Sequence, residues 1–529
     1  RRIPVPQRLY AQMQRSDLGQ TQIDLYGEVG GDTAQLFGVA PGDNRFSIPY
    51  LYTKAGYKEL DFDANSQLLD QLADERWIYG GELSGEDFNE EDRKRLGEEV
   101  KRIYLGEYQQ RWQQFVKGFS IQRFQSTAQA LDVLSKLSDP VYSPLLAIAE
   151  ITSDNTTLTP RPEVPVDASG VPLPVSSTTR RLGAAAVGGA ANALAEKFQP
   201  TVVDLRFEEL QRLTRSEKGR PARIQDYLSS ITQLQEYLSE IDSGVDTDEV
   251  AFTKAKARFS GAGDAIKQLR VKAANAPAPF NQWLEEIADS TWGLVMAKAK
   301  RHADRVWREQ VYSVYSQSLA DRFPLRASGN QEAPVMEFNK YFKPGGVEQQ
   351  FVQEYLKPFV DTRNWKLKAL EGQTLGISGN ALRQMQRAER IRKTLFAQGE
   401  QAGYSFRIEP TKLDSGVRLF ALELGGQRVP YSHGPRTRSK LDWRGGETNR
   451  VRILFEDLNE TVHRQHFEGD WAWYRLLMKS ELESSRGGSE YLVTFREAGR
   501  SAQFRLSASG MSNPFDQSLL GSYRCPQVL

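Results

Sequence analysis

The chain has 529 residues, more than the roughly 250–300 that one hydrophobic core supports, so we expect at least two domains. Its 69 basic and 68 acidic side chains nearly cancel, which gives no electrostatic case for nucleic acid or an anionic membrane as a partner. The single cysteine, Cys525, excludes an internal disulfide. No run of apolar residues approaches the ~18 that a membrane-spanning helix needs.

Apolar residues recur at helical spacing in the first part of the chain, and we assign residues 1–151 to an N-terminal helical domain. The clearest stripe, within residues 85–136, comprises Val100, Ile103, Tyr104, Tyr108, Trp112, Phe115 and Val116. Upstream, residues 47–57 form an aromatic-rich segment interrupted by proline and glycine. We expect Tyr50, Tyr52 and Tyr57 to hold this segment on the helical core.

Residues 152–185 differ in composition from what precedes them, because proline, serine and threonine replace the amphipathic pattern. Five prolines lie between Pro160 and Pro174. This composition predicts a linker that divides the helical region.

Helical spacing resumes after the linker, and we assign residues 186–399 to a second helical domain. The apolar positions of a heptad are occupied by Ile224, Ile231 and Leu238, together with Tyr227, Leu234 and Ile241. A repeat this short favours a helix of an antiparallel bundle over a true coiled coil. Further helices are predicted from Phe280 to Val314 and from Asn380 to Gln398.

Residues 400–529 show the period-two pattern of strands. Tyr404, Phe406 and Ile408 fall on one side of an extended chain, and we expect Pro410, which has no amide hydrogen, to end this strand. Residues 417–424 are mostly apolar on both sides, as in an interior strand. We therefore read residues 404–424 as the boundary between a helical body and a β-domain.

Turn signals complete the prediction for this region. Hairpin turns are expected at Gly425-Gly426 and between Glu497 and Arg500, and a short helix at Asp470–Ser484. The predicted fold class is α+β multidomain: a long all-helical body of helical bundles, followed by a C-terminal antiparallel β-sandwich.

A search for catalytic, cofactor and metal motifs returns none. The sequence has neither a phosphate-binding P-loop nor a Gly-x-Ser-x-Gly nucleophile turn. His463 and His466 have a spacing that could place two imidazoles on one helical face, but metal sites normally add further His, Cys or carboxylate ligands, so we expect a surface or packing role for this pair. A calcium loop that begins at Asp61 fails at Ser66, where glycine is required. We predict a protein that is not an enzyme and that needs no cofactor or metal.

Several segments, taken in order, resemble the periplasmic region of the IcmF family, whose members are the TssM inner-membrane scaffolds of bacterial type VI secretion systems. The resemblance spans nearly the whole chain, although no single motif is diagnostic. The segments are Ile48-Pro-Tyr-Leu-Tyr-Thr-Lys-Ala-Gly-Tyr57, Tyr104-Leu-Gly-Glu-Tyr-Gln-Gln-Arg-Trp112, Phe338-Asn-Lys-Tyr-Phe-Lys-Pro-Gly-Gly346, Trp443-Arg-Gly-Gly446 and Asn513-Pro-Phe515.

The resemblance implies a structural scaffold in the periplasm, tethered to the inner membrane by segments outside this sequence. Its β-sandwich would be C2-like and would dock an outer-membrane lipoprotein of the TssJ family. Copies would assemble as a homo-oligomer with a TssL-family inner-membrane protein. The resemblance carries over no catalytic residues. For the lipoprotein contact we nominate Asp414, Arg436, Arg444 and Tyr523, because exposed arginine and tyrosine are favoured at interfaces.

Two alternatives remain open at this point. A periplasmic protein that binds or hydrolyses cell-wall polysaccharide would present Trp443, Trp471 and Trp473 as exposed stacking surfaces, with two carboxylates about 5–10 Å apart if it were a hydrolase. A calcium-dependent membrane-docking domain would need clustered aspartates, but Asp414, Asp442, Asp457 and Asp470 are scattered singly.

Overall fold

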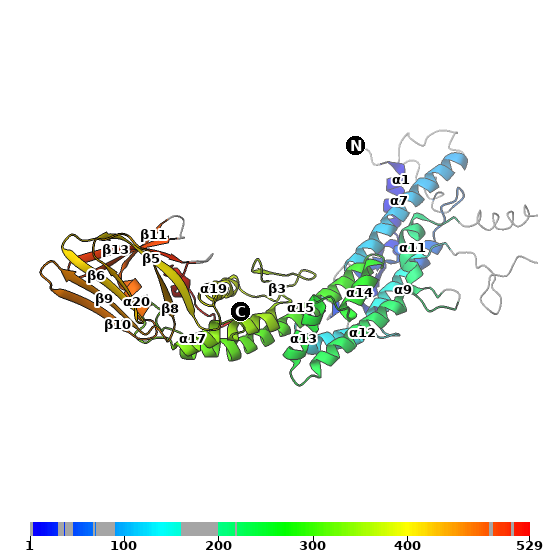
Figure 1. The fold of residues 1–529 in the computed structure, drawn as a ribbon. Coiled ribbons are helices and arrows are strands. Elements are labelled where there is room, and N and C mark those ends of the chain that lie inside the picture. The colour runs from blue at the N-terminus through cyan, green and yellow to red at the C-terminus, as the bar shows by residue number, and fades with distance from the viewer. Residues whose placement is uncertain are drawn as a thin grey trace, which may run out of the picture. The chain divides into compact units, whose positions relative to one another are not determined.

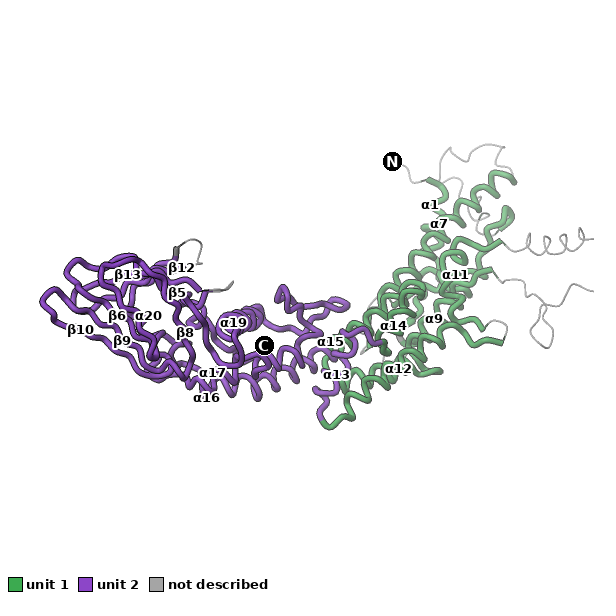
Figure 2. Tube along the Cα trace, viewed as in Figure 1, with its two compact units in different colours: residues 1–245, 263–294 green, residues 246–262, 295–529 purple. Residues whose placement is uncertain are grey.

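The computed structural model describes residues 4–29, 36–37, 46–66, 69, 90–159, 199–216, 219–485, 490–508 and 513–529. The chain forms two compact units (Figure 2). Unit 1 comprises residues 1–245 and 263–294, and unit 2 comprises residues 246–262 and 295–529. The predicted division into four segments at 151, 185 and 399 is a different one, and it stays a prediction.

Unit 1 consists mainly of helices (Figure 1). Its described elements are α1 (Val5–Arg15), α2 (Asp17–Gln20), β1 (Gln22–Asp24), α3 (Leu25–Val29), β2 (Ser47–Pro49), η2 (Tyr50–Tyr52), α5 (Lys54–Lys58), α7 (Glu90–Lys117), α8 (Thr127–Leu137), α9 (Pro144–Thr156), α11 (Val202–Thr214), α12 (Ile224–Asp242), α14 (Ala265–Ala274) and the first part of α15 (Phe280–Val306).

The predicted aromatic stripe is the core of α7. Apart from the half-buried Ile103, its members are buried. Tyr104 and Trp112 also hold the segment at residues 47–57, because their side chains donate hydrogen bonds to the carbonyls of Leu51 (2.7 Å) and Tyr52 (2.8 Å). Of the three tyrosines expected to hold the segment, Tyr52 and Tyr57 stack on Tyr104 of α7, whereas the Tyr50 hydroxyl donates to Glu59 and does not reach the core.

Two expectations about the helices meet different outcomes. All six heptad residues of α12 are buried, as predicted. The linker was expected to start at residue 152, but α9 continues to Thr156. The helix extends this far because Thr152 and Thr156 belong to its buried face. The proline-rich residues 160–185 lie outside the described part of the chain.

Unit 2 combines helices with the predicted sandwich. Its described helical elements are α13 (Thr247–Phe259), the end of α15, the π-helical turns η4 (Trp307–Tyr312) and η5 (Val352–Leu356), α16 (Ser313–Ser318), α17 (Val335–Phe342), α18 (Val347–Phe351), α19 (Gly379–Leu395), α20 (Ala472–Lys479) and α21 (Ser518–Gly521). Its strands are β3 (Val360–Asp361), β4 (Lys366–Leu367), β5 (Gly403–Leu413), β6 (Val417–Leu424), β7 (Gln427–Tyr431), β8 (Ser439–Arg444), β9 (Arg450–Asp457), β10 (Val462–Glu468), β11 (Glu481–Ser485), β12 (Glu490–Glu497) and β13 (Arg500–Ala508).

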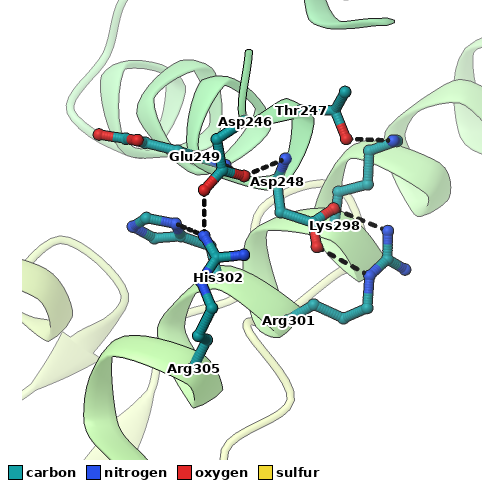
Figure 3. A network of polar contacts seen from close by, with 8 residues as sticks. All are labelled: Asp246, Thr247, Asp248, Glu249, Lys298, Arg301, His302 and Arg305. Carbon is teal, nitrogen blue, oxygen red and sulfur yellow. Dashed lines mark hydrogen bonds and ion pairs between the residues drawn. The ribbon is translucent and has the colours of Figure 1, made fainter. Parts of the chain in front are cut away.

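A network of polar contacts fastens α13 to α15 within unit 2 (Figure 3). Asp246 caps α13 by accepting from the amides of Asp248 and Glu249, and it also pairs with Arg305. Asp248 pairs with Arg301 at 2.8 Å. The acidic start of one helix therefore meets basic side chains of the other.

The predicted β-sandwich is present as two antiparallel sheets, with strand orders β10-β9-β6-β7 and β11-β12-β13-β5-β8. Aromatic side chains meet between them, with the Phe420 ring 5.6 Å from that of Phe495 and 5.0 Å from that of Phe504. The predicted turn at Gly425-Gly426 is a hairpin in which both residues have positive φ, 53° and 85°, as a type I′ turn requires.

Two predictions in the sandwich were wrong. Pro410 does not end its strand: β5 runs to Leu413, and the pairing with β13 shifts register at this point. The proline is tolerated because β8 pairs only as far as Ile408, so no amide is needed on that side. The helix expected at Asp470–Ser484 ends at Lys479, and residues 481–485 form β11.

Candidate protein-binding surface

Four chain connections meet at one end of the sandwich. They join β5 to β6 (residues 414–416), β7 to β8 (432–438), β9 to β10 (458–461) and β12 to β13 (498–499). The strand pairing brings them together, because Val417 lies opposite Asp457 and the amide of Asp414 donates to the carbonyl of Ser501 (3.1 Å). We call this surface the loop end.

Two of the four nominated residues lie at the loop end. The Asp414 carboxylate closes its turn by accepting from the amide of Gly416 (3.1 Å), and the side chain is half-buried. Arg436 is exposed in the β7–β8 connection, and it makes no hydrogen bond or ion pair with any residue that the structure describes. Arg436 is therefore free to meet a partner.

The other two nominated residues lie elsewhere. Arg444 is exposed at the opposite end of the sandwich, beside Gly445, which lies against Val335 of α17. Tyr523 was nominated as an exposed anchor, and this was wrong: it is 1% exposed, and its hydroxyl is 2.7 Å from that of Tyr341. Burial raises the pKa of Tyr523 above its ordinary range.

The end that carries Arg444 is covered by helical parts of unit 2. The Trp471 indole donates to the carbonyl of Ala333 (2.7 Å), and Arg475 pairs with Glu332 (2.6 Å). We call this the helix-facing end. The loop end has no such cover among the described residues of unit 2.

Asp457 organises the loop end. Its carboxylate accepts from the amides of Asn459 and Thr461, each at 2.9 Å, and pairs with Arg500 at 2.6 Å. The hydrogen bond from the Thr461 amide and the contact with Arg500 hold its pKa below the ordinary value. One carboxylate thus fixes the β9–β10 connection against the start of β13.

Charged pairs surround this anchor. Arg418 pairs with Glu456, and the Arg418 guanidinium also lies 3.8 Å from the carboxylate of Glu460. The hydrogen bond from Arg438 (2.8 Å) is the main cause of a lowered pKa at Glu409, and the nearby guanidinium of Arg436 adds to it. The loop end is therefore mixed in charge, and Arg436 lies near Glu409 without an ion pair to any described residue.

Leu458 is the feature of this surface that the sequence analysis missed. It occupies the connection between β9 and β10 and is 67% exposed. Val462 follows at the start of β10 and is also exposed. An apolar residue inside a short hairpin connection was the available signal, because such positions are ordinarily polar. An exposed apolar side chain on the same end of a sandwich as an exposed arginine is typical of a protein contact.

The structure removes the support for the first alternative. Trp443, Trp471 and Trp473 are all fully buried, so they offer no stacking surface to a sugar. His463 and His466 lie on β10 rather than on a helix, and three residues apart on a strand they point to opposite faces. In the described ranges, no three His, Cys, Asp or Glu side chains are grouped to hold a metal.

Family models match three parts of the chain. Residues 1–157 match the family described as "IcmF-related: Intracellular multiplication and human macrophage-killing". Residues 299–401 match the "Type VI secretion protein IcmF helical domain". Residues 406–510 match the "Type VI secretion protein IcmF C2-like domain", which covers most of the sandwich.

One curated relative and two solved structures are similar along the whole chain. The "Type VI secretion system component TssM1" of Pseudomonas aeruginosa is 28% identical over 547 residues, covering 100% of this chain and 48% of the relative. The chain therefore spans about half of that protein. A chain of a "Type VI secretion system membrane core complex" has a TM-score of 0.72 at 16% identity, covering 100% of this chain and 99% of that one. A chain of a "Type VI membrane complex" has a TM-score of 0.62 at 14% identity, covering 99% and 98%.

None of the described helices is long and apolar enough to cross a membrane.

Proposed function

The chain belongs to the IcmF family of type VI secretion proteins, and we propose that it is a non-enzymatic scaffold in the membrane complex of such a system. It acts in the periplasm and links the inner membrane to an outer-membrane lipoprotein of the TssJ family. Copies of it assemble with one another and with a TssL-family protein. The similarity to the P. aeruginosa protein along the whole chain supports this role.

We further propose that the lipoprotein binds the loop end. The observation that carries this proposal is the contrast between the two ends of the sandwich. Helical parts of unit 2 cover the helix-facing end through Trp471 and Arg475. The loop end instead presents exposed Leu458 and exposed Arg436, which has no ion pair with a described residue. A rigid sandwich that displays its connections at one end is a usual platform for binding.

Calorimetric titration tests this proposal. The complete 529-residue chain is titrated with the non-acylated soluble domain of the TssJ-family lipoprotein from the same secretion system. Leu458→Asp places a negative charge in the proposed contact, and Arg436→Glu reverses the charge at residue 436. Each substitution should weaken binding of the lipoprotein by about tenfold. Arg444→Glu is the matched control: the same reversal at an exposed arginine of the helix-facing end should change the affinity by less than about twofold.

Equal losses of affinity for Arg436→Glu and Arg444→Glu would show that the lipoprotein does not bind at the loop end. An absence of binding by the unmodified chain would remove the lipoprotein from the proposal altogether. Circular dichroism of each variant excludes misfolding as the cause of a loss.

A further inference from the structure

β11 is one of the two outer strands of the five-stranded sheet. It pairs with β12 through five residue pairs, from Glu481–Thr494 to Ser485–Glu490. An outer strand carries a row of backbone amide and carbonyl groups that point away from its neighbour. No other strand in the described part of the chain pairs with this edge.

An apolar pocket lies beside the same edge. It has a volume of about 400 Å³ and lies between α20, β11 and the segment that follows residue 513. Its apolar lining includes Leu477 and Met478 of α20, Leu482 of β11, and Phe515 and Leu520. Met478 is 42% exposed, so the pocket opens to solvent on an apolar side chain.

One side chain of β11, Leu482, lines this pocket, and its two neighbours form an acidic outer face. Leu482 lies opposite buried Val493, which places it on the inner face with the pocket. Glu481 and Glu483 lie on the other face and are exposed. Glu481 pairs with Arg496 at 3.0 Å, whereas Glu483 has no ion pair with a described residue. The strand thus offers one apolar position between two acidic ones.

We propose that this edge binds an extended segment of a partner protein, which adds to the sheet as a strand beside β11. Side chains that face each other across paired strands lie on the same face. The residue opposite Leu482 therefore enters the pocket, and its two neighbours meet Glu481 and Glu483. The fitting segment has one apolar residue between two basic ones, and its backbone supplies the hydrogen bonds.

A second copy of the chain fits this edge less well. One of the two outer strands of the other sheet, β10, has the basic residues Arg464 and His466. The residue between them is Gln465, which is polar and already half-buried against its own sandwich. β10 therefore cannot place an apolar side chain in the pocket, which favours a separate extended segment. The inference goes beyond the proposed lipoprotein contact, because β11 and its pocket are not part of the loop end.

Fluorescence anisotropy tests the inference with the complete chain and a labelled peptide, Ser-Thr-Lys-Leu-Lys-Thr-Ser. We expect saturable binding that weakens by about tenfold when the leucine is replaced by serine. Replacement of both lysines by glutamate should abolish binding. Two further peptides are N-methylated at alternating residues. Because alternate amides of a strand point to opposite sides, one of these peptides should lose binding and the other should keep it.

Variants of the chain test whether the peptide binds beside β11. Met478→Glu and Glu483→Lys change exposed residues of the pocket and edge, and each should weaken binding by about fivefold or more. Glu468→Lys is the matched control, an exposed charge reversal on β10, an outer strand of the other sheet, and should leave binding unchanged.

No saturable binding, or equal binding of both N-methylated peptides, would overturn the inference. Self-association of the chain that Glu483→Lys abolishes, with no peptide binding, would show that a second copy is the occupant and would also overturn it. None of these results bears on the lipoprotein titration, which uses other variants.

Discussion

At the scale of single residues, Asp204 joins two helices of unit 1. It is buried at the start of α11, where one oxygen accepts from the amides of Leu158 (2.8 Å) and Thr159 (3.2 Å). The other accepts from the amide (2.8 Å) and the hydroxyl (2.7 Å) of Thr201 and from the hydroxyl of Thr159 (2.9 Å). The residues that follow α9 are thereby tied to the cap of α11.

Asp204→Ala should therefore lower the free energy of unfolding by about 3 kcal/mol, because it removes charged hydrogen bonds and leaves buried donors unpaired. Urea unfolding followed by circular dichroism measures the loss. Glu209→Ala is the control on the same helix. Its side chain is 58% exposed and pairs with Arg212, so its loss should stay below about 0.5 kcal/mol. Equal losses would show that the Asp204 bonds contribute nothing beyond a surface pair.

The sequence predicted which residues are buried within one helix better than it predicted contacts between distant residues. The aromatic residues of α7 could be assigned to a core because their helical spacing is local information. Tyr523 could not be assigned to a core, because its partner Tyr341 is 182 residues away and the local sequence gives no sign of that contact. The carboxylate of Asp457 was considered only as a scattered calcium ligand, since its amide donors depend on how the β9–β10 connection folds.

At the scale of elements, the contact between α13 and α15 contains a buried histidine (Figure 3). His302 lies 5.1 Å, ring to ring, from Phe252, and its Nδ1 is 3.0 Å from a guanidinium nitrogen of Arg305. Burial and then the Arg305 charge lower its pKa, against the opposing charges of Asp246, Glu249 and Asp248. The folded chain therefore favours neutral His302.

Unit 2 should consequently lose stability as the pH falls from 7.5 to 5.5. The folded-state pKa of His302 lies below the unfolded value of about 6.5, so the unfolded chain binds more protons in this range and protonation favours unfolding. His302→Phe keeps a ring against Phe252 but cannot titrate. Its free energy of unfolding should fall less over the same range, as measured by urea unfolding at each pH. An equal fall in both proteins would assign the pH dependence to other groups.

The alternation of residues predicted the strands well, and their ends poorly. Ala502, Phe504 and Leu506 are buried on one face of β13, as a period of two requires. The end of β5 was misjudged at Pro410, because a proline is excluded only where a neighbouring strand needs its amide, and the length of β8 cannot be read from β5. β11 was missed for a similar reason: its residues read as the end of a helix until their pairing with β12 is known.

At the scale of the whole molecule, the sequence order of helices followed by strands does not give the division into compact units. Unit 2 includes residues 246–262, an excursion that carries α13, and unit 1 resumes at residue 263. A composition shift near residue 400 marks where strands begin, but a compact unit is defined by contacts between distant segments. The last residues of the chain show this most clearly, because they return to helices that precede the sandwich.

Residues 523–529 are held by partners that precede residue 400. The Trp307 indole donates to the carbonyl of Pro526 (2.7 Å), the amide of Arg524 donates to Gln384 (2.8 Å), and the amide of Leu529 donates to Asp304 (3.0 Å). A fragment that begins at residue 400 contains none of these partners. We therefore expect its C-terminal segment to be loose even where the sandwich itself folds.

Limited trypsin digestion followed by intact-mass measurement checks this expectation. In the complete chain, the bond after Arg524 should resist cleavage under conditions that remove residues 525–529 from the 400–529 fragment. Tyr523→Ala in the complete chain should release the same peptide and lower the free energy of unfolding by about 4 kcal/mol, because it empties a buried aromatic site. Val528 is 45% exposed in the same segment, so Val528→Ala should neither release the peptide nor lower the free energy of unfolding appreciably. If the fragment resists trypsin as the complete chain does, the sandwich holds its own C-terminus and the boundary near residue 400 is a true domain boundary.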